Sequence, residues 1–368
     1  MEDVQHVVVF RCPERYAAWP ANYGIWGWGN EVVSGFTLGF PSLEGGFHSR
    51  DKDRPFLTMQ SRTYDGGLTW ESELAPLLAP GGGSISAREH MNKIYEPASE
   101  GINPPIKHPG TIDIQGENFA LLFGRTGLTA GSESWFYTTN DRCVTWQGPF
   151  LFPMFEQSGV SARTDYLIDV DEPSNKLSLL LTATKPNGNE GRVFYAQTTA
   201  DGSKFEFGSW LREHPSGFDI MPSSVKLPSG LILTAVRCRT EDETRDYIDL
   251  FKSEDNGFSW ELIGTPVDQT GIGGNPPALL SLSDGRLCLI YGYRNFPFGI
   301  YAVMSSDNGV SWSDRISIRT GAGNHDIGYP RAVEVNDGRV LIYYYFNDNA
   351  EDMSLPIFKL KEIYHLLQ

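Results

Sequence analysis

The hydrophobic pattern of the chain repeats six times, and each repeat has the form of a β-hairpin. In every copy, two apolar, strand-like runs flank a short turn built on Gly, Asp or Asn, which is the strongest short-range signal for a hairpin. A regular period of this kind predicts a radial or solenoid array of equivalent units. The six copies cover residues 24–37, 110–125, 165–185, 223–239, 277–294 and 331–347.

A turn that ends in tryptophan follows most of these hairpins. Three copies, at 63–70, 253–260 and 305–312, fit the pattern Ser/Thr-x-Asp-x-Gly-x-Ser/Thr-Trp. A fourth has Cys143 in place of the glycine, and a fifth is one residue short and ends in Phe205. An Asp side chain bonds back to turn amides and Gly tolerates positive φ, so each copy is expected to close a tight turn. The aspartates of the five copies are Asp65, Asp141, Asp201, Asp255 and Asp307.

These turns resemble the Asp boxes of the sialidase (neuraminidase) superfamily, and the resemblance covers nearly the whole chain. It implies an all-β fold, a six-bladed β-propeller of four-stranded antiparallel blades, with seven blades as the alternative. We expect one domain over residues 1–368, with a loop insertion at about 71–107 that holds a short helix near 87–95. A strand at 6–11 is expected to close the outer edge of the sixth blade.

The net charge of −16 argues against nucleic acid or an anionic membrane as a partner. It does not exclude an acidic substrate, because an arginine cluster in a cleft can outweigh the global sign. The four cysteines lack metal-ligand spacing and are expected to be reduced thiols: Cys12, Cys143, Cys238 and Cys288. No cofactor is expected, although a structural calcium in the axial tunnel stays open.

The chain starts without a basic-then-apolar leader and contains no apolar run of membrane length. The expected location is therefore the cytoplasm, or outside the cell if a leader has been removed. A monomer or a small homo-oligomer is expected.

Strand order predicts where chemistry gathers. If the hairpin supplies strands one and two and the Asp box joins strands three and four, hairpin tips and boxes share one face. The loops before strand one and after strand two then share the other face, which is rich in Arg, His, Asp and Tyr. Guanidinium forks suit carboxylates, so an acidic sugar is the predicted ligand; for any single arginine, a salt bridge between blades is the alternative. The candidate substrate-binding residues are Arg50, Arg163, Asp165, Lys185, Arg237, Arg239, Tyr293 and Arg331.

The resemblance also implies catalytic positions. Sialidases bind the sugar carboxylate with three arginines and use a glutamate-activated tyrosine as nucleophile and an aspartate as acid/base. Arg237 and Tyr329 fall at the positions of one such arginine and of the nucleophile, and Asp51 (or Asp53) falls near the acid/base position.

The chain departs from that pattern at two places. Residues 20–23 lack the arginine of the family's Arg-Ile-Pro motif, and Met221 stands where the activating glutamate is expected. A tyrosine with the ordinary pKa of about 10 is a poor nucleophile without a base. Three residues remain candidates for the third arginine: Arg163, Arg294 and Arg331.

Two histidines on the same face offer acid/base chemistry near neutral pH: His48 and His108. The alternative for each is an ordinary surface-loop histidine. Some sialidase-like propellers are similar in using histidine and arginine on glucuronate-containing glycans, by hydrolysis or β-elimination. In elimination, Arg237 or Arg163 would neutralise the carboxylate, one histidine would take the C5 proton and Tyr329 would protonate the leaving oxygen.

Three functions are therefore compatible with the sequence. The first is an exo-glycosidase that cleaves a terminal acidic sugar, the second a uronate lyase, and the third a non-catalytic glycan-binding propeller.

Overall fold

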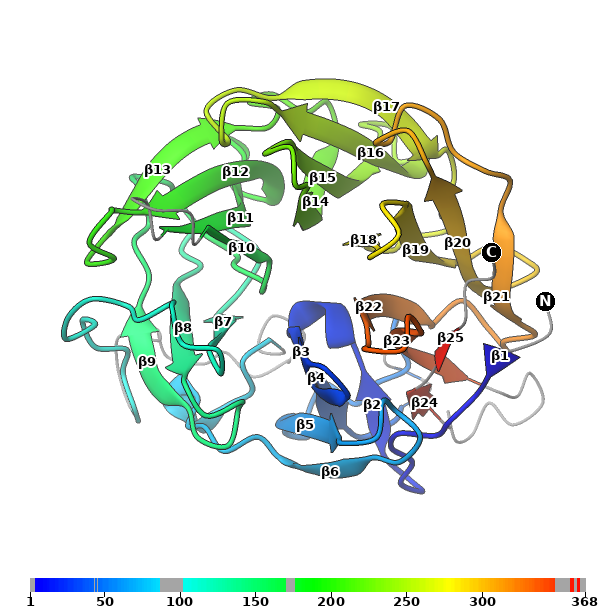
Figure 1. Ribbon diagram of the computed structural model, residues 1–368. Helices are drawn as coiled ribbons and strands as arrows, with labels where there is room; N and C mark the ends of the chain where they lie inside the picture. Colours follow the sequence, from blue (N-terminus) through cyan, green and yellow to red (C-terminus); the bar gives the residue numbers. More distant parts are fainter. Residues whose placement is uncertain are drawn as a thin grey trace.

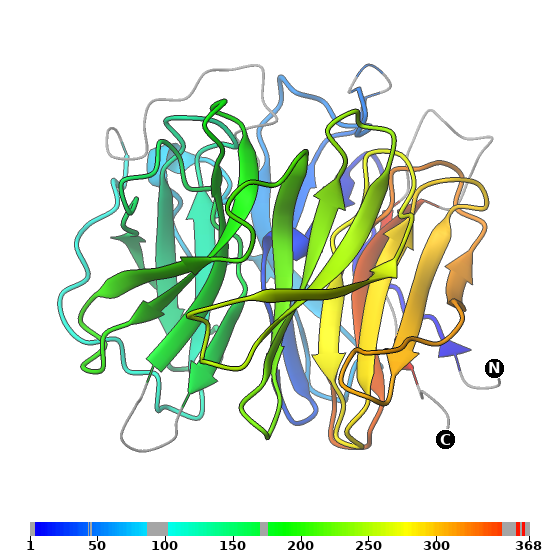
Figure 2. The same ribbon diagram turned by 90° about the horizontal axis from the view of Figure 1, so that it is seen from above.

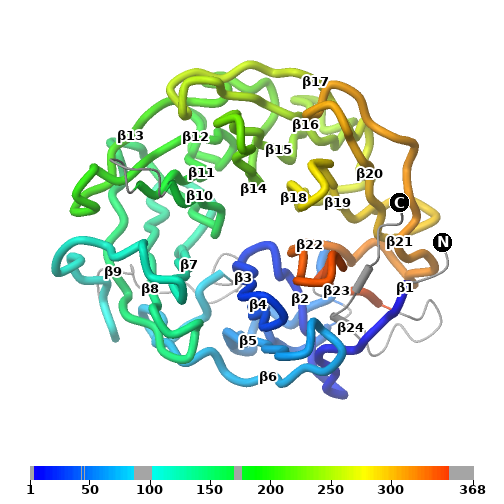
Figure 3. Tube along the Cα trace, viewed as in Figure 1, coloured from blue at the N-terminus to red at the C-terminus, as the bar shows by residue number. Residues whose placement is uncertain are grey.

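The computed structural model of the chain describes residues 4–42, 44, 46–86, 102–169, 176–347, 358–360 and 363–364. Its strands form six sheets around a central axis (Figure 1), and the sheets follow one another around the ring in chain order (Figure 3). Within the described residues, the helical elements are two short 3₁₀ turns, η1 (Pro20–Asn22) and η2 (Pro80–Gly82). None of the described helices has the length and apolar character needed to cross a membrane.

Each sheet is antiparallel, and its first hairpin strand lies nearest the axis. Sheet 1 contains β2 (Tyr16–Ala18), β3 (Ile25–Trp28), β4 (Glu31–Gly39), β5 (Leu57–Thr63) and β6 (Glu71–Leu74). Sheet 2 contains β7 (Ala120–Arg125), β8 (Ser134–Thr139) and β9 (Gln147–Leu151). Sheet 3 contains β10 (Tyr166–Asp169), β11 (Lys176–Thr184), β12 (Glu190–Thr198) and β13 (Phe205–Trp210).

The second half of the ring repeats the arrangement. Sheet 4 contains β14 (Phe218–Lys226), β15 (Ile232–Arg239), β16 (Asp246–Ser253) and β17 (Glu261–Val267). Sheet 5 contains β18 (Ala278–Ser281), β19 (Leu287–Tyr293), β20 (Gly299–Ser305) and β21 (Ile316–Thr320). Sheet 6 contains β22 (Gly328–Glu334), β23 (Val340–Asn347), β24 (Phe358–Leu360), β25 (Ile363–Tyr364) and β1 (Val4–Gln5).

The all-β propeller is confirmed, but the number of complete blades is not. Five sheets have four or more strands, whereas sheet 2 has three within the described residues. The expected inner strand of sheet 2 fails because its backbone bonds elsewhere: the Ile112 amide donates to Gly202 O of the neighbouring sheet-3 turn at 3.2 Å. Ile112 and Ile114 are nevertheless buried in the core between sheets 2 and 3. The expectation of six four-stranded blades is corrected to five complete blades and one three-stranded sheet.

Two expected boundaries also differ. The N-terminus does close sheet 6, but through β1, which pairs with β25, while β25 pairs with β23. The edge strand is therefore residues 4–5 and not 6–11, and both termini lie beside sheet 6 (Figure 1). Residues 71–74, expected to begin the insertion, form β6, and the helix expected near 87–95 lies outside the described residues.

The Asp-box turns join the third and fourth strands, as predicted. In the first copy, Asp65 Oδ1 accepts hydrogen bonds from the amides of Leu68 and Thr69, both at 2.9 Å, and Oδ2 accepts from Thr69 Oγ1 at 2.6 Å. Although burial alone would raise the pKa of Asp65, these bonds lower it to about 2. Asp141, Asp255 and Asp307 repeat the bonds to the fourth residue on, and Asp201 holds its shorter turn through Ser203.

Hairpin tips and Asp boxes share a face. The Gly66 amide in the first box donates to Asn30 O in a hairpin tip at 2.9 Å, and the Arg142 amide donates to Asn118 O at 3.1 Å. Because the strands run from one face of the ring to the other (Figure 2), the loops after β15 and before β22 lie at the opposite face.

Candidate functional site

A cavity of about 450 Å³ opens among the loops of the face opposite the Asp boxes. The described residues that line it include five arginines, one glutamate, His48 and Tyr329. This lining is strongly cationic although the whole chain is acidic. The arginines are Arg125, Arg163, Arg237, Arg239 and Arg294.

Kinks in three inner strands shape the cavity floor. Trp19, Met221 and Tyr329 adopt positive φ of 62°, 52° and 50°, and each directly precedes a proline. In sheets 4 and 6, the strand register shifts at these kinks. All three side chains belong to one buried cluster. Strained backbone of this kind is concentrated at functional sites, because the surrounding structure must hold it in place.

Arg237 and Arg294 lie on either side of the Tyr329 phenol and are 8% and 1% exposed. Arg237 Nη1 is 3.5 Å from the Tyr329 hydroxyl and 3.5 Å from Met221 Sδ, and Nη2 donates to Gly273 O. Nε of Arg237 is buried and has no hydrogen-bond partner in the described part of the chain.

Arg294 likewise bonds to neutral groups only. Its guanidinium donates to Gly274 O at 2.9 Å, to Ile327 O at 3.0 Å and to the Tyr345 hydroxyl at 3.0 Å. Two buried cations without a directly bonded carboxylate therefore face one cavity, an arrangement that favours an anionic ligand.

The same charges act on the tyrosine. Burial alone would raise the pKa of Tyr329, but Arg237 and Arg294 outweigh this effect and lower the pKa below its ordinary value. Met221 leaves the phenol without the expected glutamate base, yet the guanidinium groups stabilise the phenolate instead.

His48 and Asp326 form a buried pair at the side of the cavity. His48 Nδ1 lies 2.6 Å from Asp326 Oδ1, and the carboxylate also accepts from the Ser49 amide at 2.9 Å and the Tyr345 hydroxyl at 2.6 Å. Trp19 Nε1 lies 3.4 Å from the same histidine nitrogen, and the much shorter carboxylate contact assigns the proton to Nδ1. Nε2 is then the basic nitrogen.

Burial determines the charge state of this pair. It lowers the pKa of His48 to about 4, and the attraction of Asp326 offsets only part of that effect. Burial alone would raise the pKa of Asp326, but His48 and Arg294 hold it below its ordinary range. At neutral pH the site therefore contains a neutral imidazole beside an ionised carboxylate, which is the protonation state of a general base.

Five residues predicted from sequence line this cavity: Tyr329, His48, Arg237, Arg163 and Arg239. Two of them are already ion-paired. Arg163 contacts Glu190 at 2.9 Å, and Arg239 contacts Asp246 at 2.9 Å.

Other predicted residues lie outside the cavity. His108 packs against Phe150 of β9, with ring centroids 4.5 Å apart. Asp51 accepts the Asp53 amide at 2.9 Å, and neither carboxylate lines the cavity. Arg50 donates to His48 O at 3.2 Å from behind that loop.

Two further candidates make structural contacts near the rim. Lys185 donates to Gly217 O. The Tyr293 ring packs against Arg315 and Tyr301, with the Arg315 guanidinium carbon 4.9 Å from its centroid. Neither lines the cavity.

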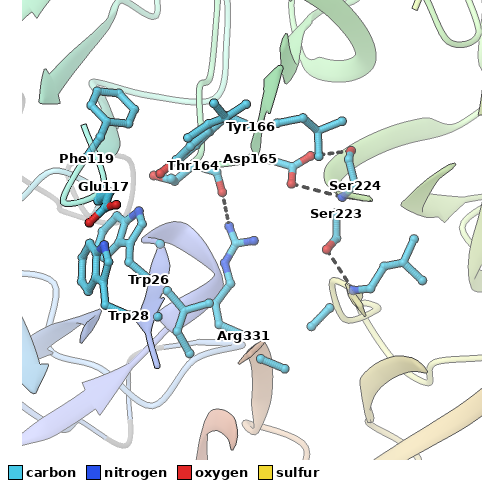
Figure 4. A pocket seen from close by; sticks show the side chains of 18 of the residues that line it. Trp26, Trp28, Glu117, Phe119, Thr164, Asp165, Tyr166, Ser223, Ser224 and Arg331 are labelled. Carbon is cyan, nitrogen blue, oxygen red and sulfur yellow. Dashed lines mark hydrogen bonds between the residues drawn. The ribbon is translucent and has the colours of Figure 1, made fainter. Parts of the chain in front are cut away.

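Asp165 and Arg331 line a second cavity of about 520 Å³ along the axis, toward the hairpin tips. Asp165 accepts from Ser224 N at 3.1 Å and from Ser224 Oγ at 2.7 Å, which ties sheet 3 to sheet 4 (Figure 4). Arg331 donates to Thr164 O at 2.6 Å and to Ala21 O at 2.9 Å. Burial raises the pKa of Asp165 to about 6 and lowers that of Arg331 to about 10. These two residues act as ties between sheets.

Sequence reasoning gave no role to Asp326 or Tyr345. Both belong to the loops of the functional face, and that position was the only available signal. Their pairing with His48 joins residues 278 positions apart and is invisible in the sequence. Within the described residues, no group of three or more His, Cys, Asp or Glu is placed to hold a metal ion.

Comparisons with known proteins agree with this architecture. The family model described as a BNR repeat-like domain matches residues 157–361, more than half of the chain. No curated protein matches the sequence. Among solved structures, a protein of unknown function from Dyadobacter fermentans is similar at 20% identity, with a TM-score of 0.71 and 99% of each chain covered.

Two sialidase structures are also similar. The NanB sialidase of Streptococcus pneumoniae has 12% identity and a TM-score of 0.62, over 97% of this chain and 70% of that one. The intramolecular trans-sialidase of Ruminococcus gnavus has 11% identity and a TM-score of 0.61, over 94% of both chains. Likeness at such identities concerns the fold. The chain belongs to the BNR repeat-like domain family and has the β-propeller fold of the sialidase superfamily.

Proposed function

We propose that the cavity binds the carboxylate of a terminal acidic sugar and that the protein cleaves the glycosidic bond of that sugar. The observation that carries this proposal is the pair Arg237 and Arg294, buried cations whose direct hydrogen-bond partners are all neutral. Burying such charges is costly unless an anion compensates them. The cavity volume of about 450 Å³ suits a small ligand.

The first candidate reaction is hydrolysis, which the sialidase fold neighbours favour. A water oxygen bonds to the anomeric carbon while the bond to the leaving oxygen breaks. His48 Nε2 takes a proton from the water, and the Tyr329 hydroxyl protonates the leaving oxygen. The resulting phenolate is stabilised by Arg237 and Arg294, which already lower its pKa. Positioned acid/base groups of this kind contribute about 10²–10⁴ in rate.

The second candidate is β-elimination on a uronate, and one observation favours it. The only carboxylate among the described lining residues, Glu190, is bonded to Arg163 at 2.9 and 3.2 Å, so the cavity offers a neutral histidine and no unpaired carboxylate. His48 would take the C5 proton, a double bond would form between C4 and C5, and Tyr329 would protonate the departing C4 oxygen. Arg237 would neutralise the uronate carboxylate.

One digest separates the candidates. The protein is incubated with acidic oligosaccharides that end in sialic acid, glucuronic acid or another uronic acid, and the products are analysed by mass and by near-ultraviolet absorbance. Hydrolysis adds one water to the products, whereas elimination adds none and creates an absorbing unsaturated sugar. Tyr329→Phe should abolish either reaction. Saturable binding without turnover in the unmodified protein would identify a glycan-binding propeller and contradict cleavage.

A further inference from the structure

A second cavity of about 390 Å³ adjoins the proposed active site. The two cavities share Phe47, Arg239 and Gly273. The remaining wall comes from the loops after β15, β17 and β19, on the same face of the ring. A ligand that fills the first cavity and continues along the surface would therefore enter this second one.

The second cavity differs from the first in charge. Its described lining contains one arginine and two carboxylates, and these groups pair with one another. Arg239 Nε lies 2.9 Å from Asp246 Oδ1, and Arg239 Nη1 lies 3.3 Å from Glu243 Oε2. The first cavity, by contrast, combines five arginines with a single glutamate. An anionic ligand is favoured in the first cavity and disfavoured in the second.

The second cavity offers hydrogen-bond donors of fixed orientation. Gln269 Oε1 accepts the Gly271 amide at 3.3 Å, and Asn295 Oδ1 accepts the Ile272 amide at 3.2 Å. With both oxygens held by backbone, the two side-chain NH₂ groups make no hydrogen bond to the described residues and can donate to a ligand. Beside them, Ile272 is 56% exposed and Phe47 is 37% exposed. Neutral donors next to apolar surface suit an uncharged sugar ring.

The wall between the cavities is built on a glycine. Gly273 has φ of +71°, and a Cβ there would lie 2.4 Å from the Phe47 ring, so only glycine lets this ring pack against the backbone. Gly273 O also accepts a hydrogen bond from Arg237. The residue that bounds the second cavity thus also orients the cation of the first.

We propose that the second cavity binds an uncharged sugar linked to the acidic sugar, so that the protein recognises an acidic–neutral disaccharide unit. This inference rests on the proposed function, because it assumes that the acidic sugar occupies the first cavity. Gln269 and Asn295 donate to hydroxyl oxygens of the neutral ring, and Ile272 contacts its apolar side.

The test uses the Tyr329→Phe variant, so that ligands are not cleaved, with isoleucine methyl groups isotopically labelled for NMR. The probes are N-acetylneuraminic acid, D-glucuronic acid, and each of these sugars joined to one galactose. Ile272→Val assigns the Ile272 methyl signal. The test variant adds Gln269→Ala and Asn295→Ala. The matched control adds Gln115→Ala and Asn336→Ala, two exposed amides in hairpin tips of the opposite face.

The proposal expects one acidic monosaccharide to bind without moving the Ile272 signal. Its galactose-linked form should bind about tenfold more tightly, as one or two added hydrogen bonds allow, and should shift that signal. The test variant should lose this gain and keep the monosaccharide affinity, while the control should change neither. Equal affinities of the two ligand forms, or an unmoved Ile272 signal, would overturn the second cavity but leave the proposed function intact. Failure of both acidic monosaccharides to bind would overturn the proposed function, and this inference with it.

Discussion

Replacing Arg237 separates a substrate-binding arginine from an inter-sheet tie. Arg237→Ala removes hydrogen bonds to Gly273 O and to the Tyr329 hydroxyl, each worth about 1 kcal/mol net. It also removes a buried cation, and burial of this group is unfavourable enough to lower its pKa. The two effects oppose one another, so the free energy of unfolding should change by only about 1 kcal/mol.

The effect on function should be much larger. An electrostatic contact that tightens in the transition state is worth about 10²–10³ in rate, so Arg237→Ala should lower turnover of an acidic glycan by that factor. Arg237→Lys keeps the charge but loses the planar fork, and only partial rescue is expected. The pKa of Tyr329 should rise in the alanine variant, because Arg237 is the strongest of the charges that lower it.

The assay compares kcat/KM on acidic oligosaccharides with urea unfolding of the same proteins. Arg331→Ala is the matched control: Arg331 has the same 8% exposure, but it ties sheets together in the axial cavity. The control should lose stability and keep its kcat/KM in the folded fraction. If Arg237→Ala instead loses stability and retains turnover, Arg237 is a structural tie and the site assignment is refuted.

Three further predictions concern the acid/base pair, the axial ties and substrate choice. Asp326→Asn should lower kcat by about 10²–10⁴ while KM changes little, because His48 loses its orienting carboxylate; normal kcat in the folded fraction would make Asp326 purely structural. Burial raises the pKa of Asp165 to about 6, above the roughly 4 of an unfolded chain, so its protonated form stabilises the fold by about 2–3 kcal/mol below pH 4 and this contribution is lost as pH rises through 6. Urea unfolding from pH 4 to 7.5 should show this slope in the unmodified protein but not in Asp165→Asn, and parallel curves would contradict it. A fluorogenic sialoside should turn over well below about 1 per second, since Met221 replaces the glutamate base; rates in the ordinary enzyme range would contradict the role given to that position.

The repeat was predictable because its physics is local. Each Asp box closes within a few residues, as the bonds from Asp65 to Leu68 and Thr69 show, so eight residues of sequence contain the whole turn. Strand order then placed the boxes and the functional loops on opposite faces. The expected strand in sheet 2 failed for the converse reason. Alternation correctly predicted that Ile112 and Ile114 are buried, but the hydrogen-bond partner came from sheet 3.

The site was predictable only as a pool of residues. Loop position could not distinguish Arg237, which bonds to neutral groups, from Arg163, which is neutralised by Glu190. Nor could it reveal that Asp326 orients His48, because that contact depends on the closure of the ring, which brings sheets 1 and 6 together. Position in the chain defined which face carries chemistry, and tertiary contacts decided which residues act together.

The most direct test of the central claim is a crystal structure of the Tyr329→Phe variant soaked with N-acetylneuraminic acid or D-glucuronic acid. The proposed site predicts that the sugar carboxylate lies within hydrogen-bond distance of both Arg237 and Arg294, with the ring between His48 and residue 329. An acidic sugar bound in the axial cavity beside Arg331, or a carboxylate turned away from Arg237 and Arg294, would contradict it.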